Sequence, residues 1–323
     1  MTTWGIISTA DINRLVIPPA QESPKVDLVG VASRTQERAD EYAAQWGIPR
    51  AYGSYEALLA DPEIEAVYIS LPNTMHAEWS IASVEAGKHV LCEKPFTRHP
   101  EEVTASWDAA DKAGKLLSEA FMYRHNPQTK KLRALIDEGA IGEVRLIRSA
   151  FSYSLYDADN IRLRTDVEGG ALMDVGCYCV SGARLAAGAE PEWVSGQAWY
   201  GPSGTDWVFT GQMRFPGDVL AIFDCGTALP NRDELEVIGS EGSLFLDDPW
   251  HARTPVIELR RRDGGVERIE TELADSYGLE LENVGDAAAG EAELLLGRDD
   301  AMGQARALEA LHESAQRGAP VTL

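Results

Sequence analysis

The residues that could do chemistry gather in two short stretches of the chain. The first is Glu93-Lys94-Pro95, which follows the apolar run 90–92. Such a run is typical of a short buried strand, and in open α/β sheets ligands bind beyond the carboxyl ends of the strands. Pro95 restricts Lys94 to extended backbone, so the ammonium group leaves the strand end in a fixed direction. It could donate a hydrogen bond or a proton to a substrate oxygen. The alternative is a surface ion pair before a turn.

The second stretch, residues 168–178, places two glycines before a helix that we expect over 171–187. Asp174 and Tyr178 are four positions apart, so they should lie on one face of that helix. Gly176 between them would allow close approach by another group. A carboxylate and a phenol that face a lysine can form a proton-transfer site. The alternative is that Asp174 caps a neighbouring turn and that Tyr178 is a core aromatic.

Strands and helices alternate through the first part of the chain. The pattern predicts strands over 4–9, 26–32, 65–71, 90–92 and 115–122, with helices opening at 10–13 and spanning 35–46, 76–86 and 100–113. Alternation at this spacing is typical of βαβ units. We therefore predict an α/β fold in which residues 1–122 form a dinucleotide-binding Rossmann domain with a doubly wound parallel sheet.

The pattern changes after Met122. A helix from Pro127 and a strand over 144–154 come first. The helix 171–187 is then followed by strand-like runs over 193–199, 207–215, 219–225, 234–238, 243–246, 256–261 and 266–271, and a last helix lies near 301–317. Successive strands with short turns favour an antiparallel sheet. We expect residues 123–323 to form an α+β domain for substrate binding and oligomerisation, with a large, open-faced, mostly antiparallel sheet. Its last helix could pack on the first domain.

The turn after the first strand should bind a dinucleotide. Ser8, Ala10 and Asn13 stand where the Rossmann pattern has three glycines. The first two are small enough to let the backbone approach a pyrophosphate, although less freely than glycine. The cofactor-binding residues expected in this turn are Ser8, Thr9, Ala10, Asp11 and Ile12.

The end of the second strand favours NADP over NAD as the cofactor. An acidic residue normally binds the ribose hydroxyls at this point, but Ser33 and Arg34 stand there instead. A hydroxyl and a guanidinium suit a 2′-phosphate, through hydrogen bonding and a charge-assisted contact. The alternative is that Arg34 is a solvated residue at a helix start.

Composition argues against several classes of protein. The 323 residues carry a formal net charge of −23, which disfavours nucleic-acid binding. No apolar run approaches the roughly 18 residues of a membrane helix, and the N-terminus lacks the basic region of a secretory signal. The four cysteines include no Cys-x-x-Cys pair, so we expect no metal site and a reducing, cytoplasmic location.

The order and spacing of these motifs resemble the glucose–fructose oxidoreductase / inositol dehydrogenase / MocA family over essentially the whole chain. The motifs that carry the resemblance are the first strand and turn, Pro72-Asn73 with His76, Glu93-Lys94-Pro95, Tyr123-Arg124 with Pro127, Gly169-Gly170-Ala171-Leu172 with Asp174 and Gly176, and the last helix ending in Gly318-Ala319-Pro320-Val321.

The resemblance implies an NAD(P)-dependent oxidoreductase of sugars, polyols or related compounds. It makes Lys94 the substrate-binding and catalytic lysine and Asp174 a residue that binds or orients the substrate. Further residues that would line the cofactor are Leu71, Pro72, Asn73, His76, Glu93 and Arg124. Many members have histidine where this chain has Tyr178. With tyrosine at this position, the chain resembles the subgroup that contains the xylose and dihydrodiol dehydrogenases and certain sugar ketoreductases.

We therefore predict hydride transfer between NADP and a sugar-like alcohol or carbonyl, with Tyr178 and Lys94 moving the proton on the substrate oxygen. Loop 155–168 would contact the substrate, and the C-terminal sheet would form a homo-oligomer, a dimer or a tetramer. One alternative is an NAD-preferring polyol dehydrogenase. Another is a non-catalytic dinucleotide-binding regulator, because fold alone does not fix function.

Overall fold

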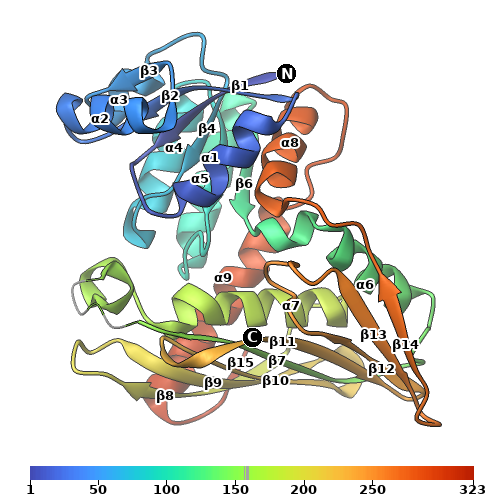
Figure 1. Cartoon of the computed structure of the whole chain (residues 1–323). Coiled ribbons are helices and arrows are strands. Elements are labelled where there is room, and N and C mark those ends of the chain that lie inside the picture. Colours follow the sequence, from blue (N-terminus) through green and yellow to red (C-terminus); the bar gives the residue numbers. More distant parts are fainter. Residues whose placement is uncertain (156, 158–159) are drawn as a thin grey trace. The chain divides into compact units, whose positions relative to one another are not determined.

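The computed structural model describes residues 1–155, 157 and 160–323 (Figure 1). It divides into two compact units. The first unit comprises Met1–Met122 and Asp275–Met302, and the second comprises Tyr123–Ala274 and Gly303–Leu323. The chain thus passes between units at the residue where its sequence pattern changes, and it returns to the first unit for the segment from Asp275 to Met302. Residues 156, 158 and 159 of the predicted substrate loop lie outside the described residues.

A six-stranded parallel sheet in the order β3-β2-β1-β4-β5-β6 forms the centre of the first unit (Figure 1). The strands are β1 (Thr2–Ile7), β2 (Val26–Ala32), β3 (Arg50–Tyr52), β4 (Ala66–Ile69), β5 (His89–Glu93) and β6 (Leu117–Ala120). This order is that of a doubly wound Rossmann sheet, as predicted. All four residues of β4 are buried, because helices cover both faces of a parallel sheet.

The helices of the first unit connect these strands. They are α1 (Asn13–Glu22), α2 (Gln36–Trp46), α3 (Tyr55–Leu59), α4 (His76–Glu85), α5 (Pro100–Ala113) and α8 (Ser276–Ala288), with a short 3-10 turn, η1 (Asn73–Met75), before α4. Leu281 and Val284 of α8 join Trp4 of β1 in the core. The sequence analysis did not predict α3, β3 or α8. The five residues of α3 and the three of β3 are too few to show a period. In the 13-residue α8, Tyr277, Leu281 and Val284 do recur at helical spacing, and this signal was missed.

A nine-stranded sheet forms most of the second unit, in the order β14-β13-β12-β11-β7-β10-β9-β8-β15. The strands are β7 (Val144–Ser154), β8 (Trp193–Tyr200), β9 (Asp206–Phe215), β10 (Val219–Gly226), β11 (Ala228–Gly239), β12 (Gly242–Leu246), β13 (Val256–Arg261), β14 (Val266–Glu270) and β15 (Val321–Thr322). Strands β7 and β10 pair in parallel and the other neighbours pair antiparallel. The prediction of a mostly antiparallel second sheet is therefore confirmed.

Helix α7 (Cys177–Ala187) lies across one face of this sheet (Figure 1). The other helices that belong wholly or partly to the unit are α6 (Pro127–Asp137), α9 (Arg298–Arg317) and the 3-10 turns η2 (Met122–His125), η3 (Ile161–Leu163), η4 (Thr165–Val167) and η6 (Pro216–Asp218). In β10, Ala221 and Phe223 are buried, whereas Leu220 and Ile222 are 49% and 41% exposed. One face of the sheet thus carries exposed apolar side chains. Among the described residues, no helix is both long and apolar enough to span a membrane.

Candidate active site

The cofactor-binding residues predicted in the first unit follow the carboxyl ends of four neighbouring strands. Because the strands are parallel, those ends meet at one edge of the sheet. Residues 8–12 follow β1, Ser33 and Arg34 follow β2, residues 71–73 follow β4, and Glu93 with Lys94 closes β5. Parallel pairing therefore brings together segments that are up to 85 positions apart in the chain (8 to 93).

Ser8, at the first glycine position of the turn, has φ +118°, a backbone conformation that glycine adopts most readily. Hydrogen bonds hold it there. The Ser8 hydroxyl lies 2.9 Å from both the carbonyl oxygen and Oγ of Ser70, and Asn13 Nδ2 donates to the Ser8 carbonyl at 3.0 Å. Ser70 Oγ in turn donates to Asn13 Oδ1 at 2.7 Å. A buried hydrogen-bond network thus stabilises Ser8 in a backbone conformation that glycine adopts more readily.

The same turn shows which main-chain groups could meet a pyrophosphate. The Ala10 N–H donates to Ser8 Oγ at 3.1 Å, so that donor is already used within the protein. The next two residues, Asp11 and Ile12, come immediately before α1 and are exposed and half-buried. Backbone amides at a helix start attract phosphate. The small residues and the open helix start fit a dinucleotide, with Asp11 and Ile12 as the expected donors.

Two guanidinium groups follow β2, although the sequence singled out only Arg34. Arg34 and Arg38 are both exposed, and both lie near enough to Tyr55 for their positive charges to act on its phenol. Arg38 Nε donates to Thr9 Oγ1 at 2.8 Å, which links the end of β2 to the first turn. Arg38 lies four residues after Arg34, in the first turn of α2. A charged residue at a helix start is usually only a solvated surface residue, so the sequence analysis assigned Arg38 no role. Sequence spacing could not show that it reaches Thr9.

Glu93 is buried, and its two oxygens accept hydrogen bonds inside the first unit. Tyr68 donates its phenol proton to Oε1, and the Lys94 N–H donates to Oε2 at 3.2 Å. Burial and the charge of Glu93 raise the pKa of Tyr68, so the phenol stays protonated as the donor. Burial and the same charge also raise the pKa of Glu280 in α8. The Glu93 carboxylate therefore fixes the backbone of Lys94 through the Lys94 N–H. Together with burial, its charge also raises the pKa of Glu280, a fully buried acid that the sequence analysis did not find.

His76, which was predicted to contact the cofactor, is 1% exposed. Its ring nitrogens face main-chain oxygens: Nε2 lies 2.8 Å from the Leu71 carbonyl oxygen, and Nδ1 lies 2.9 Å from that of Pro95. The ring therefore touches the main chain after β4 and the main chain after Lys94.

In the second unit, two side chains hold the Asp174 carboxylate. Tyr153 donates its hydroxyl to Oδ2 at 2.5 Å, and Arg162 donates Nε to Oδ1 at 3.0 Å. Burial, and then the charge of Asp174, raises the pKa of Tyr153. The sequence analysis missed both partners. The alternation of β7 pointed only to a strand, and Arg162 lies in an irregular loop without a period.

The helix predicted over 171–187 has a different geometry at its start. Leu172–Gly176 is a π-helix, and α7 follows from Cys177, so Asp174 belongs to a wider turn than Tyr178. The prediction of one continuous α-helix is therefore wrong in its first turn. A Cβ atom at Gly176 would lie 2.8 Å from Cys225 Sγ of β10, which explains why only glycine fits there. Such π-turns are frequently found at functional sites.

The Tyr178 ring lies in an aromatic cluster and is 6% exposed. Its ring centroid is 5.3 Å from that of Phe151, 5.8 Å from Tyr123 and 5.9 Å from Trp250. Arg124 Nη1 donates to Ser181 Oγ at 3.4 Å, in the next turn of α7. Within the second unit, Asp174 and Tyr178 thus belong to the helical segment 172–187, and Arg124 contacts the same segment.

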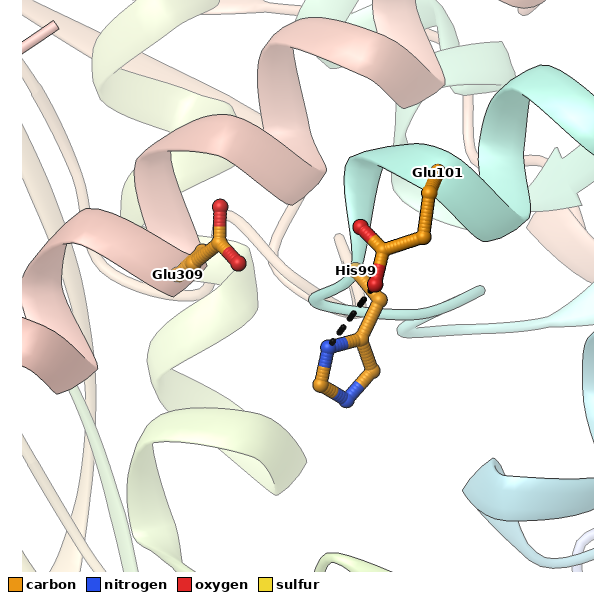
Figure 2. Close-up of side chains that lie close together, drawn as sticks. All are labelled: His99, Glu101 and Glu309. Atoms are coloured by element: carbon orange, nitrogen blue, oxygen red, sulfur yellow. Dashed lines mark ion pairs between the residues drawn. The ribbon is translucent and has the colours of Figure 1, made fainter.

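Two groups of acidic and histidine side chains lie outside these stretches. His99 Nδ1 is 3.9 Å from Glu101 Oε1 at the start of α5 (Figure 2). Figure 2 also draws Glu309, which belongs to the second unit, and no site is assigned to the three. In the second unit, Arg253 already holds Asp248 at 2.9 and 3.0 Å.

His251 Nδ1 lies 3.0 Å from Oδ2 of Asp233 in the same cluster. Arg253 Nη2 also lies 3.7 Å from Asp233 Oδ2, so one guanidinium group lies beside both carboxylates of this cluster.

Comparison with known proteins identifies the family. Residues 2–121 match the GFO/IDH/MocA model described as an oxidoreductase family with an NAD-binding Rossmann fold, and residues 129–245 match the C-terminal domain of the same family. The D-xylose 1-dehydrogenase (NADP(+)) 2 of Haloferax volcanii is 36% identical over 323 residues, which cover 99% of each chain. The chain belongs to the GFO/IDH/MocA family of oxidoreductases, as its motifs predicted.

Solved structures agree over the whole chain. The aldose-aldose oxidoreductase of Caulobacter crescentus, in complex with glycerol, has a TM-score of 0.92 and 26% identity, with 100% of this chain and 99% of that chain covered. A 3-ketoreductase of Actinomadura kijaniata, in complex with NADP and TDP-benzene, has a TM-score of 0.90 and 29% identity, with 97% of each chain covered. Other structures of that ketoreductase carry a replaced tyrosine or a replaced lysine.

Proposed function

We propose that this protein is an NADP-dependent oxidoreductase that interconverts an alcohol and a carbonyl group on a sugar or a sugar-like compound. The observation that carries the proposal is Lys94 at the carboxyl end of β5, in a Rossmann unit whose β2 is followed by Arg34 and Arg38. A relative with NADP in its name and a ketoreductase solved with NADP support this cofactor.

Each site residue has a role in this proposal. The turn at Ser8 admits the pyrophosphate, and Arg34 with Arg38 binds the 2′-phosphate. When bound, the nicotinamide supplies or accepts the hydride. Lys94 donates a hydrogen bond to the substrate oxygen, and Tyr178 gives or takes the proton of that oxygen.

Asp174, held by Tyr153 and Arg162, accepts a hydrogen bond from a substrate hydroxyl. The support for combining Lys94 with Asp174 and Tyr178 on one substrate comes from the family to which the chain belongs.

The exposed face of the nine-stranded sheet supports a homo-oligomer. Trp199 of β8 is 58% exposed, and Leu220 and Ile222 of β10 are 49% and 41% exposed. The register of β8, β9 and β10 places these three side chains on one face. By contrast, Phe209 of β9 and Phe223 of β10 are buried, and their rings stack on each other. A second copy would cover the exposed apolar side chains.

An Ile222→Glu variant would place a charge on that face and should yield monomers in sedimentation velocity. A wild-type protein that sediments as a monomer would contradict the oligomer. The four cysteines are free and buried, which supports a reducing compartment such as the cytoplasm.

The test is a substrate panel with both cofactors. We expect NADP⁺ reduction with an aldose, or NADPH oxidation with a keto sugar, at a kcat/KM at least tenfold above that with NAD(H). A preference for NAD⁺ with polyols would instead favour a polyol dehydrogenase. Tight NADPH binding without turnover on any sugar, polyol or dihydrodiol would favour a dinucleotide-binding regulator.

A further inference from the structure

His76, the first residue of α4, lies between two main-chain segments at the carboxyl edge of the first sheet. Its Nε2 is 2.8 Å from the carbonyl oxygen of Leu71, just after β4. Its Nδ1 is 2.9 Å from the carbonyl oxygen of Pro95 and 3.2 Å from that of Phe96. Pro95 directly follows Lys94, so the imidazole joins the loop after β4 to the residues that carry the lysine.

These contacts with carbonyl oxygens restrict how the ring can hydrogen-bond. Carbonyl oxygens only accept hydrogen bonds, and a neutral imidazole has one N–H, so the ring can donate on both sides only as an imidazolium. Burial lowers the pKa of His76 and the charge of Lys94 lowers it further, against three carbonyl contacts that raise it. Since the net direction is downward, the ring is neutral at neutral pH and donates to one segment at a time.

Two carboxylates hold the main-chain amides on either side of Pro95. The Phe96 N–H donates to Glu119 Oε1 at 2.7 Å, and the Phe96 ring packs edge-on against Trp107 with a centroid distance of 5.0 Å. The Lys94 N–H donates to Glu93. Both amide donors that flank Pro95 are therefore satisfied by carboxylates. His76 Nδ1 lies within reach of two carbonyl oxygens and Nε2 within reach of one, so a proton on Nδ1 can serve both the Pro95 and the Phe96 acceptors.

We propose that His76 is a positioning residue whose Nδ1–H holds the Pro95–Phe96 main chain and thereby fixes Lys94 at the carboxyl end of β5. The ring is buried, so it acts through the main chain. The effect on rate rests on the proposed function, whereas the effect on Lys94 itself does not.

Two isosteric variants separate the two sides of the ring. The amide nitrogen of Asn overlays Nδ1 of histidine, and that of Gln overlays Nε2, so each variant keeps one donor. His76→Asn keeps the donor to Pro95 and should retain kcat within about threefold. His76→Gln keeps the donor to Leu71 and should lower kcat roughly 10- to 100-fold, since small misplacements of a catalytic group cost that much. Native fractions from circular dichroism normalise both rates. Equal rates for the two variants, or the reverse order, would overturn the proposal.

A double-mutant cycle tests whether the effect passes through Lys94. In a Lys94→Met background, His76→Gln should cause no further loss of kcat, because the group that it positions is already gone. Additive losses would show that His76 acts on something else.

A readout without turnover completes the test. Reductive methylation with ¹³C-formaldehyde labels the lysines, and loss of one resonance in Lys94→Met assigns Lys94. We expect the chemical shift of the Lys94 resonance to change in His76→Gln and to stay in place in His76→Asn. If neither variant moves it, the inference fails. A protein that is inactive on every substrate yet shows the expected shifts would instead disprove the proposed function alone.

Discussion

The Leu172 N–H donates a 2.7 Å hydrogen bond to Oδ2 of Asp206, which joins β9 to the start of the π-helical turn that carries Asp174. Gly170 makes room for this contact. It has φ +126°, and a Cβ atom there would lie 1.9 Å from Asp206 Oδ1. Asp206 is 8% exposed, so burial raises its pKa, whereas backbone amides lower it by hydrogen bonding to the carboxylate. It therefore stabilises a helix start from a position where its own charge is poorly solvated.

Asp206 should make stability depend on pH. Burial raises its pKa from 3.8 to about 7, against backbone hydrogen bonds that lower it. An acid whose pKa is higher in the folded state stabilises the fold below its unfolded pKa, and that contribution is lost as the pH rises through the folded pKa. Between pH 5.5 and pH 8, the wild type should lose about 2 kcal/mol of unfolding free energy relative to Asp206→Asn.

Urea unfolding of the two proteins at several pH values between 5.5 and 8 measures this difference. Asp218→Asn, which changes an exposed aspartate between β9 and β10, serves as the control and should follow the wild-type curve. Parallel curves for the wild type and Asp206→Asn would show that Asp206 does not titrate in this range.

Arg34 and Arg38 should set the preference for NADP(H). Each alanine variant should weaken NADPH binding by roughly tenfold or more, because each removes a charge-assisted contact to phosphate. Arg34→Ala should barely change NADH binding, whereas Arg38→Ala should weaken it slightly, since Arg38 also holds Thr9. Fluorescence titration with both cofactors measures the difference, with Arg145→Ala in the second unit as a charge-matched control. Equal losses for NADPH and NADH would rule out a phosphate contact.

The ends of the parallel strands were the part of the fold that the sequence predicted well. Buried runs ending in Ser8, Ser33, Leu71 and Glu93 identify parallel strands, and parallel strands must present their carboxyl ends at one edge. The residue types at those ends then indicated the chemistry. This information is local in the sequence, because each motif lies within a few residues of the strand that positions it.

Contacts between distant segments could not be predicted. Ser70 and Asn13 are 57 positions apart and Tyr153 and Asp174 are 21 apart, and nothing in the spacing links them. The π-turn before α7 also escaped prediction, because residues 172–176 have ordinary helical composition. The turn packs Gly176 closely against Cys225 of β10, a contact between residues 49 positions apart. Such features depend on tertiary packing, which hydrophobic periodicity does not encode.

Lys94 should be needed for turnover and not for folding. Lys94→Met keeps most of the side-chain volume and removes the charge, so we expect an unchanged melting temperature and a rate lower by at least ~10². Lys88 serves as a control with the opposite expectation, because we expect it to be needed for stability and not for turnover. It is 5% exposed, and its Nζ donates to the carbonyls of Asp61 and Ile64 at 2.6 and 2.7 Å.

Lys88→Met leaves two carbonyls without that donor and should lower stability by roughly 1–3 kcal/mol with kcat per folded molecule preserved. Thermal melts and initial rates of both variants show whether each lysine is needed for turnover or for stability. A Lys94→Met protein that unfolds, or that turns over normally, would make Lys94 a structural residue.

Tyr178 should carry the proton of the substrate oxygen. Two phenols of the second unit, Tyr153 of β7 and Tyr178 of α7, differ in their surroundings. Tyr153 donates to Asp174, and both burial and that carboxylate raise its pKa, so it is a poor base near neutral pH. Tyr178 lies instead among the rings of Phe151, Tyr123 and Trp250. Replacing it by phenylalanine keeps that packing and removes one oxygen, so the melting temperature and cofactor affinity should not change.

The rate of Tyr178→Phe should fall by roughly 10²–10⁴, and the pH–rate profile of alcohol oxidation should lose its ascending limb, since that limb reports the base. Tyr153→Phe is the matched control. It removes one donor from Asp174 and should raise the KM for substrate while the limb remains. If Tyr178→Phe keeps its rate and its pH profile, the proton passes through Lys94 alone and Tyr178 only packs the core. If Tyr153→Phe loses the limb instead, the two phenols exchange roles.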